Sequence, residues 1–445
     1  MDLTSVKNIH FVGIGGIGIS AMARMMHARG KRVSGNDIGE FEINKALERQ
    51  GIEVKIGKTI AEVPDDAELV VYSVAWNDMV PELLNEIRER GVPMLTYPQM
   101  LKLVSENLFT IAVSGTHGKT TTTAMTAKVL REGKLDPTVI VGSLLKEEDL
   151  GLPTSNGSRT ERGTNFVAGE SNYLVVEADE YRRAFLNLSP SILVITNIDL
   201  DHLDFYKDLA DIQNTFKELV ARLPADGALI CNPNDPHVAP VAAAARCAVI
   251  DYTHAGPLGY KLKVPGNHNM QNAQAANAVG EFLGIDGEVR ARALATFSGT
   301  WRRFDFLGET STGVLIYDDY AHNPQKVRAA LQGARELYSD RSITAVFQPH
   351  LYSRTKHLLG DFAQSFASAD HVILAPIYAS REAYDPSITS NMLEAEMKKY
   401  HGDVLFLENF QKIETHLLAT TQKGDVVVCI GAGDISKFCE EFVKK

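Results

Sequence analysis

Short apolar runs alternate with segments of helical periodicity along the whole chain. Runs rich in β-branched residues, such as Phe109–Val113 and Tyr173–Glu177, predict buried strands, and the pattern of Asn269–Leu283 predicts a helix. Because strands and helices alternate throughout, we expect an α/β fold with mainly parallel sheets covered by helices. The other predicted strands are Ile9–Gly13, Leu69–Ser73, Ile192–Thr196, Val314–Tyr317, Ile343–Phe347, His371–Leu374 and Val426–Ile430.

The same pattern separates three blocks, which we expect to be domains: residues 1–107, 108–299 and 300–445. Segment 146–170 lacks periodicity and is rich in Glu, Gly, Ser, Thr and Asn, so it predicts a long loop.

The composition is typical of soluble globular proteins, with 44% hydrophobic and 23% charged residues. No apolar run approaches the roughly 20 residues that cross a bilayer, and the first residues lack the pattern of a signal peptide. We therefore expect a cytoplasmic protein without a membrane role. A formal charge of -11 argues against non-specific binding to nucleic acid. Four scattered cysteines predict buried thiols rather than a zinc site or a disulfide framework.

The strand predicted at Phe109–Val113 leads into a glycine-rich phosphate turn, Gly115-Thr-His-Gly-Lys-Thr-Thr121. Glycines allow backbone N–H groups to face phosphate oxygens, and the next helix presents its positive end to the same anion. Lys119 is suited to neutralise the β- and γ-phosphates of ATP, and Thr120 to offer its hydroxyl to Mg²⁺. The general pattern has glycine where this chain has Val113, and an ordinary turn before a helix also needs glycines.

A second glycine-rich turn, Gly13-Ile-Gly-Gly-Ile-Gly18, lies near the start of the chain. It follows a predicted strand and opens a helix, which is the arrangement that places a pyrophosphate on a helix N-terminus. Asp37 lies nineteen residues after Gly18, near the position of the acidic residue that binds a ribose in dinucleotide-binding proteins. NAD is therefore an open alternative, but the phosphate turn in the next block favours a substrate that carries a nucleotide.

Acidic groups follow two predicted strands of the central block. Glu177, Asp179 and Glu180 follow the first, and His202 lies in an aspartate-rich run after the second. We expect both strand ends to face the phosphate turn, because ligands of parallel sheets lie beyond the carboxyl ends of the strands. One carboxylate with Thr120 and phosphate oxygens is a sufficient set for Mg²⁺, and Glu177 is the first choice. Asp179 and Glu180 also fit helix caps, and His202 fits a cap or a core imidazole.

Motifs along the whole chain resemble those of the ATP-dependent Mur ligases. This family uses the shortened Gly-Thr-x-Gly-Lys-Thr form of the phosphate turn, so Val113 does not count against an ATP site. The segments that carry the resemblance are Gly13–Ser20, Gly115–Thr123, Glu177–Glu180, Thr196–Asp204, Pro265–Asn272, Phe297–Phe304, Asp318–Pro324 and Phe347–Thr355.

The resemblance implies a Rossmann-like N-terminal domain for a UDP-sugar, a central P-loop ATPase domain and a Rossmann-like C-terminal domain for an amino acid. It implies that ATP phosphorylates the lactyl carboxylate of UDP-N-acetylmuramate and that the amine of L-alanine attacks the acyl phosphate, in peptidoglycan precursor synthesis. The implied cofactors are ATP and one or two Mg²⁺ ions. Since carboxylate and triphosphate repel each other, such a site must neutralise phosphate charge.

The resemblance also implies roles for individual residues. Those implied for ATP are Gly115, Thr116, His117, Gly118, Lys119, Thr120, Thr121, Asn269, Asn272, Arg302, Arg303 and Asp319. Those implied for the UDP-sugar are Gly13, Gly15, Gly16, Gly18, Asp37, Ser73 and His322. The implied catalytic residues are Lys119, Glu177, His202, Arg303, His350 and Arg354, and the implied metal ligands are Thr120, Glu177 and His202.

Asn323, Leu351 and Arg381 depart from the family pattern, which has a histidine, an arginine and a glycine there. These departures lie in the domain that selects the amino acid, so the pattern specifies the acyl phosphate chemistry more closely than the amino acid. Lys217 lies where several sister ligases carry a carbamylated lysine. The alanine-adding ligases generally lack that group, and we expect Lys217 on the surface of a helix.

Three alternatives stay open. A recycling ligase would attach an intact murein peptide to the same UDP-sugar. An NAD(P)-dependent oxidoreductase would use the Gly13–Gly18 turn and Asp37, but would leave Lys119 and Glu177 without a role. A non-catalytic nucleotide-binding scaffold would not depend on Lys119.

Overall fold

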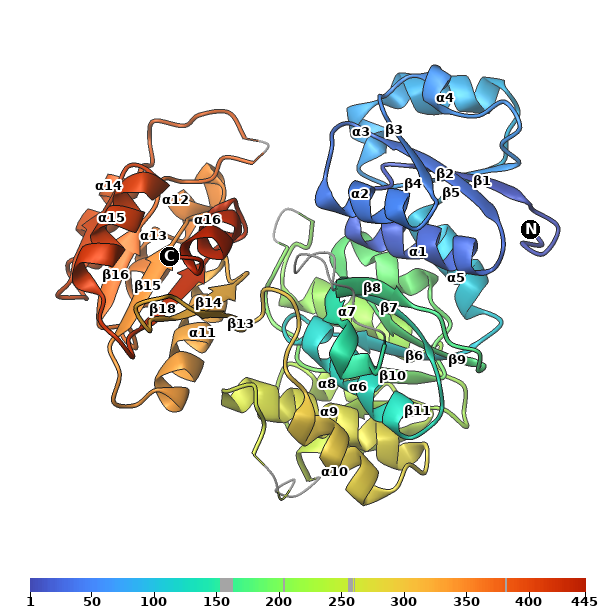
Figure 1. Ribbon diagram of the computed structural model, residues 1–445. Helices are drawn as coiled ribbons and strands as arrows, with labels where there is room; N and C mark the ends of the chain where they lie inside the picture. Colours follow the sequence, from blue (N-terminus) through green and yellow to red (C-terminus); the bar gives the residue numbers. More distant parts are fainter. Residues whose placement is uncertain (153–162, 203–204, 255–258, 260, 381) are drawn as a thin grey trace. The chain divides into compact units, whose positions relative to one another are not determined.

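The computed structural model describes residues 1–152, 163–202, 205–254, 259, 261–380 and 382–445 (Figure 1). These residues form three sheets flanked by helices. The chain divides into two compact units: the first unit is Met1–Leu262 with Gln271–Ser298, and the second unit is Lys263–Met270 with Gly299–Lys445. Two sheets belong to the first unit and one to the second. The predicted α/β fold with mainly parallel sheets is confirmed. The three domain boundaries stay a prediction.

The first sheet is fully parallel. Its strands are β1 (Asn8–Val12), β2 (Arg32–Asp37), β3 (Glu53–Ile56), β4 (Leu69–Tyr72) and β5 (Met94–Thr96), in the order β3-β2-β1-β4-β5. The accompanying helices are α1 (Ile17–Ala28), α2 (Glu42–Arg49), η1 (Ile60–Glu62), α3 (Trp76–Met79), α4 (Pro81–Glu89) and α5 (Tyr97–Ser105). The strand order reverses between β1 and β4, and Rossmann-like sheets bind ligands at such a switch point.

The second sheet is parallel except at one edge. Its strands are β6 (Phe109–Ser114), β7 (Thr138–Lys146), β8 (Gly163–Val167), β9 (Tyr173–Glu177), β10 (Ile192–Ile195), β11 (Ala228–Cys231) and β12 (Ala248–Asp251), in the order β12-β11-β10-β6-β9-β7-β8. Only β7 and β8 pair antiparallel among the described strands of this sheet. The helices of this part of the chain are α6 (Lys119–Glu132), η2 (Glu147–Leu150), η3 (Tyr181–Asn187), α7 (Leu209–Val220), α8 (Ala239–Ala242), η4 (Tyr252–His254), α9 (Asn267–Phe282) and α10 (Gly287–Thr296).

The loop predicted for 146–170 is wrong in part, because this segment contains η2 and β8. Asn165, in the middle of β8, is fully buried and bonds to helix α1. A buried polar side chain conceals the apolar alternation by which a strand is recognised from sequence. The rest of the predicted loop includes residues 153–162, which lie outside the described residues.

The third sheet forms the centre of the second unit. Its strands are β13 (Asp305–Glu309), β14 (Leu315–Asp319), β15 (Ile343–Phe347), β16 (His371–Leu374), β17 (Val404–Phe406) and β18 (Val426–Ile430), in the order β13-β14-β18-β15-β16-β17. The edge strand β13 pairs antiparallel with β14, and the other pairs are parallel. The helices are α11 (Pro324–Leu337), α12 (Tyr352–His357), α13 (Leu359–Ala363), α14 (Ser390–Met397), α15 (Phe410–Thr420) and α16 (Ile435–Phe442).

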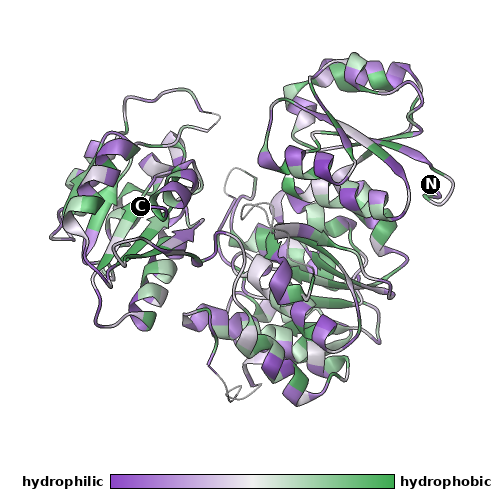
Figure 2. Cartoon of the chain, in the orientation of Figure 1, coloured by the Kyte–Doolittle hydropathy of each residue, from purple (hydrophilic) through white to green (hydrophobic). Residues whose placement is uncertain are grey.

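The central strands are continuous apolar runs, as Figure 2 shows by colour. All residues of β10, β15 and β18 are buried. Parallel strands covered by helices on both faces need such runs, and these strands could therefore be predicted from the sequence. Cys231, Cys429 and Cys439 are buried thiols as expected, whereas Cys247 is partly exposed.

One buried histidine makes the stability of the first sheet depend on pH. His10, in β1, is 1% exposed, and its ring nitrogens lie 2.9 Å from Ser34 Oγ and 3.1 Å from Asn36 Oδ1. Burial lowers the pKa of His10 to about 4 from 6.5, although the Asn36 bond opposes this change. Near pH 6, His10 therefore binds a proton in the unfolded chain but not in the folded chain. The contribution of neutral His10 to the free energy of unfolding is complete above the unfolded pKa and is lost as the pH falls toward 4.

We expect the non-titrating variant His10→Gln to lose less stability on acidification than the wild type. Between pH 7 and pH 4.5 the difference in lost free energy should be about 2–3 kcal/mol. Hydrogen exchange of the β1 amides, corrected for the intrinsic effect of pH on exchange, measures this difference in free energy. The β10 amides serve as an internal control. Equal losses in both proteins would contradict this assignment.

Candidate active site

Two glycines shape the phosphate turn between β6 and α6. Gly115 has a φ of 130° and Gly118 a φ of 82°, which residues with side chains rarely adopt. A Cβ atom on Gly115 would lie 2.2 Å from Thr196 Oγ1, and one on Gly118 would lie 2.4 Å from Asn272 Oδ1. Both positions therefore require glycine, and the turn packs closely against the residues after β10 and against α9.

Hydrogen bonds from the end of β10 hold the turn in place. Asn197 accepts the N–H of Thr116 through its carbonyl at 3.1 Å and the N–H of His117 through Oδ1 at 2.9 Å. Thr196 Oγ1 donates to the carbonyl of His117 at 2.6 Å. The N-terminus of α6 is thus fixed at the carboxyl end of the sheet, where an anion binds favourably.

The structure brings Thr120 and Glu177 together. Thr120 Oγ1, in the first turn of α6, donates to Glu177 Oε1 at 2.9 Å, and the backbone N–H of Gly142 donates to Oε2 at 2.7 Å. Glu177 ends β9, as predicted. A hydroxyl and a carboxylate oxygen suit Mg²⁺, so these residues fit the predicted cation.

Lys119 is held by a carboxylate that the sequence did not single out for this role. Its Nζ lies 2.8 Å and 3.1 Å from the two carboxylate oxygens of Glu180 and 2.6 Å from the carbonyl of Gly115. Burial alone would raise the pKa of Glu180, but the Lys119 ammonium and the hydrogen bonds to His202 and Lys119 together outweigh burial, and the pKa falls to about 2. Glu180 precedes η3 without a side-chain capping bond, so the cap interpretation is wrong for this residue. Asp179 Oδ1 does accept the N–H of Tyr181 at 3.2 Å.

His202 lies on the other side of the same carboxylate. Its Nε2 is 3.6 Å from Glu180 Oε1, and its ring packs on Tyr181 at 4.8 Å between centroids. Burial opposes protonation, but the Glu180 hydrogen bond and the charges of Asp201, Glu180 and Asp179 together outweigh burial and raise the pKa of His202. Potential ligand atoms of Asp179, Glu180 and His202 lie within 4.8 Å of one another. His202 and Lys119 therefore contact the same carboxylate beside the phosphate turn.

The first glycine turn connects β1 to α1, and Asp37 shapes it. Asp37 Oδ2 accepts the N–H of Gly15 at 2.7 Å, and Oδ1 accepts the N–H of Ile38 at 2.7 Å. The carboxylate predicted for a ribose thus already supports the turn. A Cβ on Gly18 would lie 2.9 Å from the ring of Tyr97, so this glycine allows α1 and α5 to pack closely. Ser73 directly follows β4, at the same sheet edge.

A buried polar cluster joins the two sheets of the first unit. Asn165 in β8 donates to Ser20 Oγ of α1 at 2.8 Å and to the carbonyl of Ile17, and its Oδ1 accepts Arg24 Nη1 at 2.7 Å. Arg24 also contacts Thr164 Oγ1 at 3.3 Å. Figure 1 shows α1 beside β7 and β8. The helix that begins at the first glycine turn is therefore attached to the sheet that carries the phosphate turn.

In the second unit, the two neighbouring arginines are in different environments. Arg302 is 5% exposed, lies 3.1 Å from Asp318 Oδ2 and donates to the carbonyl of Gly431. Arg303 is less buried, with its guanidinium 5.2 Å from the ring centroid of Tyr320. The expectation that both contact ATP stays a prediction, and the two arginines differ in that the Arg302 guanidinium is enclosed in this unit.

The other residues predicted in the second unit gather around the carboxyl ends of β14 and β15. Asp319 accepts the N–H groups of Phe304 and Ala321 at 2.7 Å each. His350 Nδ1 lies 3.1 Å from Arg354 Nη1, and the rings of His322 and His350 are 6.2 Å apart. Burial lowers the pKa of His322 well below its usual value, so this ring is neutral.

The structure explains one departure from the family pattern. Asn323 caps α11, because its Oδ1 accepts the N–H of Lys326 at 2.9 Å. Leu351 precedes α12 with a φ of 69° and lies mostly buried, and nothing in its surroundings explains the choice of leucine. Arg381 lies outside the described residues.

Three further predicted positions lie on helices. Asn272 Oδ1, in α9, accepts the hydroxyl of Thr122 at 3.1 Å. Asn269, one turn earlier, donates through Nδ2 to the carbonyl of Pro265 at 2.7 Å. Lys217 lies partly exposed on α7, and its Nζ is 3.5 Å from Asn214 Oδ1.

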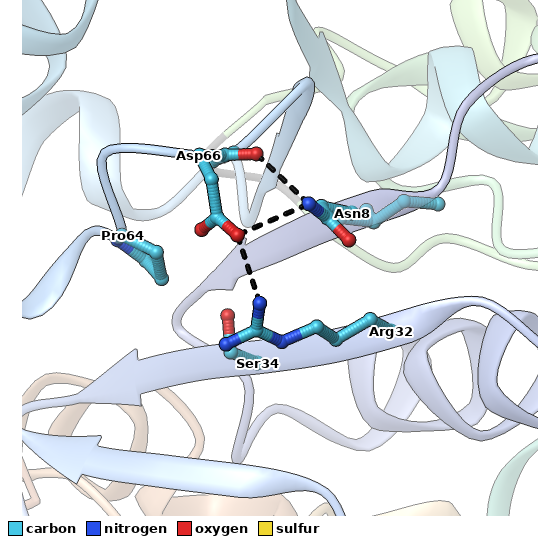
Figure 3. A pocket seen from close by; sticks show the side chains of 7 residues that line it. Asn8, Arg32, Ser34, Pro64 and Asp66 are labelled. Carbon is cyan, nitrogen blue, oxygen red and sulfur yellow. Dashed lines mark hydrogen bonds and ion pairs between the residues drawn. The ribbon is translucent and has the colours of Figure 1, made fainter.

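A small hollow lies at the end of the first sheet opposite the Gly13–Gly18 turn (Figure 3). Asp66 accepts from Asn8 at 3.2 Å and from Arg32 at 2.8 Å there. Asn8 and Arg32 begin β1 and β2, so this hollow adjoins the amino ends of the strands. Ligands of parallel sheets bind at the carboxyl ends, and none of the predicted residues lies in this hollow.

Comparison with known proteins connects these features. Three family models match in order: "Mur ligase family, catalytic domain" over residues 8–107, "Mur ligase middle domain" over 113–258 and "Mur ligase, glutamate ligase domain" over 302–433. The UDP-N-acetylmuramate--L-alanine ligase of Salinibacter ruber is 38% identical and covers 99% of this chain and 95% of its own length. The chain belongs to the Mur ligase family.

Solved structures agree with this assignment. The UDP-N-acetylmuramate-alanine ligase of Thermotoga maritima matches 98% of both chains with a TM-score of 0.80 and 29% identity. The murein peptide ligase of Psychrobacter arcticus matches 98% of both chains with a TM-score of 0.68 and, at 22% identity, shows a shared fold. Membership in the Mur ligase family removes the oxidoreductase alternative. Within the described residues of this Mur ligase, no helix is long and apolar enough to span a membrane.

Sequence reasoning missed Glu180 as the partner of Lys119 and Asn165 as the residue that attaches α1 to β8. Both make their decisive contacts with residues more than sixty positions away, so no local motif reveals them. An acidic residue in the run after β9 was the only available signal for Glu180, and it also fitted a cap.

We expect Asn165→Ala to loosen α1 in this Mur ligase, because it leaves the buried Arg24 guanidinium without its amide partner. Loss of a hydrogen bond to a charged group costs about 2 kcal/mol, or about thirtyfold in local exchange rate. Hydrogen exchange of the α1 amides measures this loss. Asn107→Ala, which removes one exposed bond of 3.4 Å, is the matched control. Unchanged protection of α1 would contradict the role of Asn165.

Proposed function

We propose that this Mur ligase joins L-alanine to the lactyl carboxylate of UDP-N-acetylmuramate, with cleavage of ATP to ADP and phosphate, in peptidoglycan precursor synthesis. The observation that carries the proposal is the match of nearly the whole chain to ligases of that name. Residues 1–107 would bind the UDP-sugar, 108–299 ATP and 300–445 the amino acid. The cytoplasm supplies ATP, UDP-sugar and amino acid, so we assign the enzyme to that compartment.

The phosphate turn and its surroundings support an ATP site. Backbone N–H groups of Gly115–Thr121 and the α6 N-terminus would face the phosphates, and Lys119 would neutralise them. Thr120 and Glu177 would hold Mg²⁺, and His202 a second ion or the substrate carboxylate. Bound Mg²⁺ would supply charge neutralisation and orient the γ-phosphate. The residues proposed for the adenine and ribose are Asn269, Asn272 and Asp319.

The first glycine turn supports binding of the UDP pyrophosphate at the N-terminus of α1. Asp37 holds this turn through Gly15, so its first role would be to keep the N–H groups in place for the anion. Ser73 lies at the same carboxyl edge, beside the switch point of the sheet. His322 would contribute a neutral ring on the sugar side.

The reaction would proceed in two transfers. An oxygen of the lactyl carboxylate attacks the γ-phosphorus, and ADP leaves. The amine of L-alanine then attacks the acyl carbon, inorganic phosphate leaves, and the nitrogen gives up a proton. Lys119 and Arg303 would stabilise charge on the transferred phosphoryl group. Arg354, in contact with His350, would pair with the alanine carboxylate.

Substrate selection tests the proposal directly. We expect ADP release when UDP-N-acetylmuramate is offered with L-alanine, weaker release with glycine or L-serine, and none with an intact murein tripeptide. A coupled assay of ADP across this panel measures it. Turnover with the tripeptide alone would replace the proposal with the recycling ligase.

We expect Lys119→Ala to lower ADP formation by about 10²–10³-fold, because an electrostatic contact to the transferring phosphate is lost. UDP-N-acetylmuramate affinity should change less than about twofold, since the sugar's pyrophosphate binds at another helix N-terminus. Steady-state kinetics and calorimetry measure the two quantities. Lys217→Ala, at a partly exposed position on α7, is the matched lysine control. Lost sugar affinity with normal ATP turnover would refute the assignment, and unchanged turnover would favour the scaffold alternative.

A further inference from the structure

Two of the three polar contacts of the Lys119 ammonium group are with the carboxylate of Glu180. Glu180 Oε2 and Oε1 lie 2.8 Å and 3.1 Å from Lys119 Nζ, and the Glu180 side chain is 3% exposed. The third contact of Nζ is the carbonyl of Gly115, within the phosphate turn. An ammonium group has three donors, so Lys119 cannot contact phosphate oxygens without giving up at least one of these partners.

The backbone on both sides of Glu180 is fixed. The hydroxyl of the buried Tyr206 donates to the carbonyl of Glu180, and Ser114 Oγ donates to the carbonyl of Ala178 at 2.8 Å. Ser114 is the last residue of β6, so the phosphate turn and the Glu180 segment share one support. A rearrangement at this position therefore involves the side chain of Glu180 rather than its backbone.

His202 is the one other basic residue within 4 Å of the Glu180 carboxylate among the described residues. Its Nε2 lies 3.6 Å from Oε1, the oxygen that is also the more distant from Lys119. A short rotation of the carboxylate would exchange the Lys119 contact for a full hydrogen bond to His202. A buried carboxylate needs such a replacement when its first partner leaves, because an unpaired charge is unfavourable away from water.

We propose that Glu180 is a positioning residue that holds Lys119 before ATP binds and orients His202 after ATP has drawn Lys119 away. The proposal rests on the proposed function, since it takes the triphosphate as the competing anion. It gives Glu180 two opposite effects: competition with ATP for Lys119, and support of the chemical step through His202.

The two effects predict a split between nucleotide affinity and turnover in Glu180→Gln. The amide keeps the shape of the side chain but carries no charge, so Lys119 is free for phosphate. ATP should bind about tenfold more tightly, a change of about 1.4 kcal/mol. The kcat should fall about tenfold, because an amide orients the His202 ring less strongly than a carboxylate.

The experiment compares the full-length wild type with Glu180→Gln and with Glu132→Gln. Glu132 pairs with Lys128 at 3.1 Å near the other end of α6, so this control removes a similar pair away from the turn. Calorimetry with ATP and Mg²⁺ alone gives the affinity, and ADP release with all substrates gives kcat and KM. We expect Glu132→Gln to match the wild type in both.

A second measurement keeps the proposal testable if Glu180→Gln does not fold. In wild-type protein labelled with ¹⁵N-histidine, a non-hydrolysable ATP analogue should shift the His202 Nε2 resonance, which is assigned by its loss in His202→Gln. Equal or weaker ATP binding by Glu180→Gln, an unchanged kcat, or an unshifted His202 resonance overturns the proposal. Failure of the wild type to bind ATP overturns the proposed function itself, which separates the two failures.

Discussion

The narrow turn between β6 and α6 is the constraint on which the site depends. Because Gly115 and Gly118 carry no side chains, Thr196 and Asn197 reach the turn and fix it before any anion arrives. Donors that are already oriented need no reorganisation when charge develops on a bound phosphate. The register of the sheet places the Glu177 carboxylate beside this turn, because Val113 of β6 pairs with Glu177 of β9. Turn, helix end and acidic group therefore meet at one edge as a consequence of strand pairing.

Much of the fold was predictable because buried parallel strands are continuous apolar runs. The predicted bounds of β9, β15, β16 and β18 agree with the structure. Val113 also has a physical explanation, since it is a fully buried strand residue and the turn begins only after Ser114. Glycine was therefore never required at that position. The edge strand β8 escaped prediction because one of its two buried positions is occupied by Asn165, whose polar side chain bonds to a helix far away in sequence.

The candidate site was predictable in its residue types but not in its internal pairs. A motif identifies Lys119, yet only the folded chain brings Glu180 to it. The same holds for Arg302, which a local pattern cannot distinguish from Arg303. Arg302 is enclosed because Asp318, on β14, lies 3.1 Å from its guanidinium. Which of two neighbouring arginines is enclosed within the unit is decided by long-range contacts, and sequence spacing carries no information about it.

These internal pairs explain how a chain of formal charge -11 can be suited to polyanionic ligands. The favourable potential at each glycine turn comes from backbone N–H groups and a helix N-terminus, and these do not depend on net charge. Lys119 would be costly to bury alone, and Glu180 compensates its charge; in our proposal a bound triphosphate takes over this role. A triphosphate carries more charge than one carboxylate, so the exchange favours the ligand. The net negative charge of the chain then repels anions for which the protein has no such glycine turn. Local geometry rather than net charge is therefore the source of affinity.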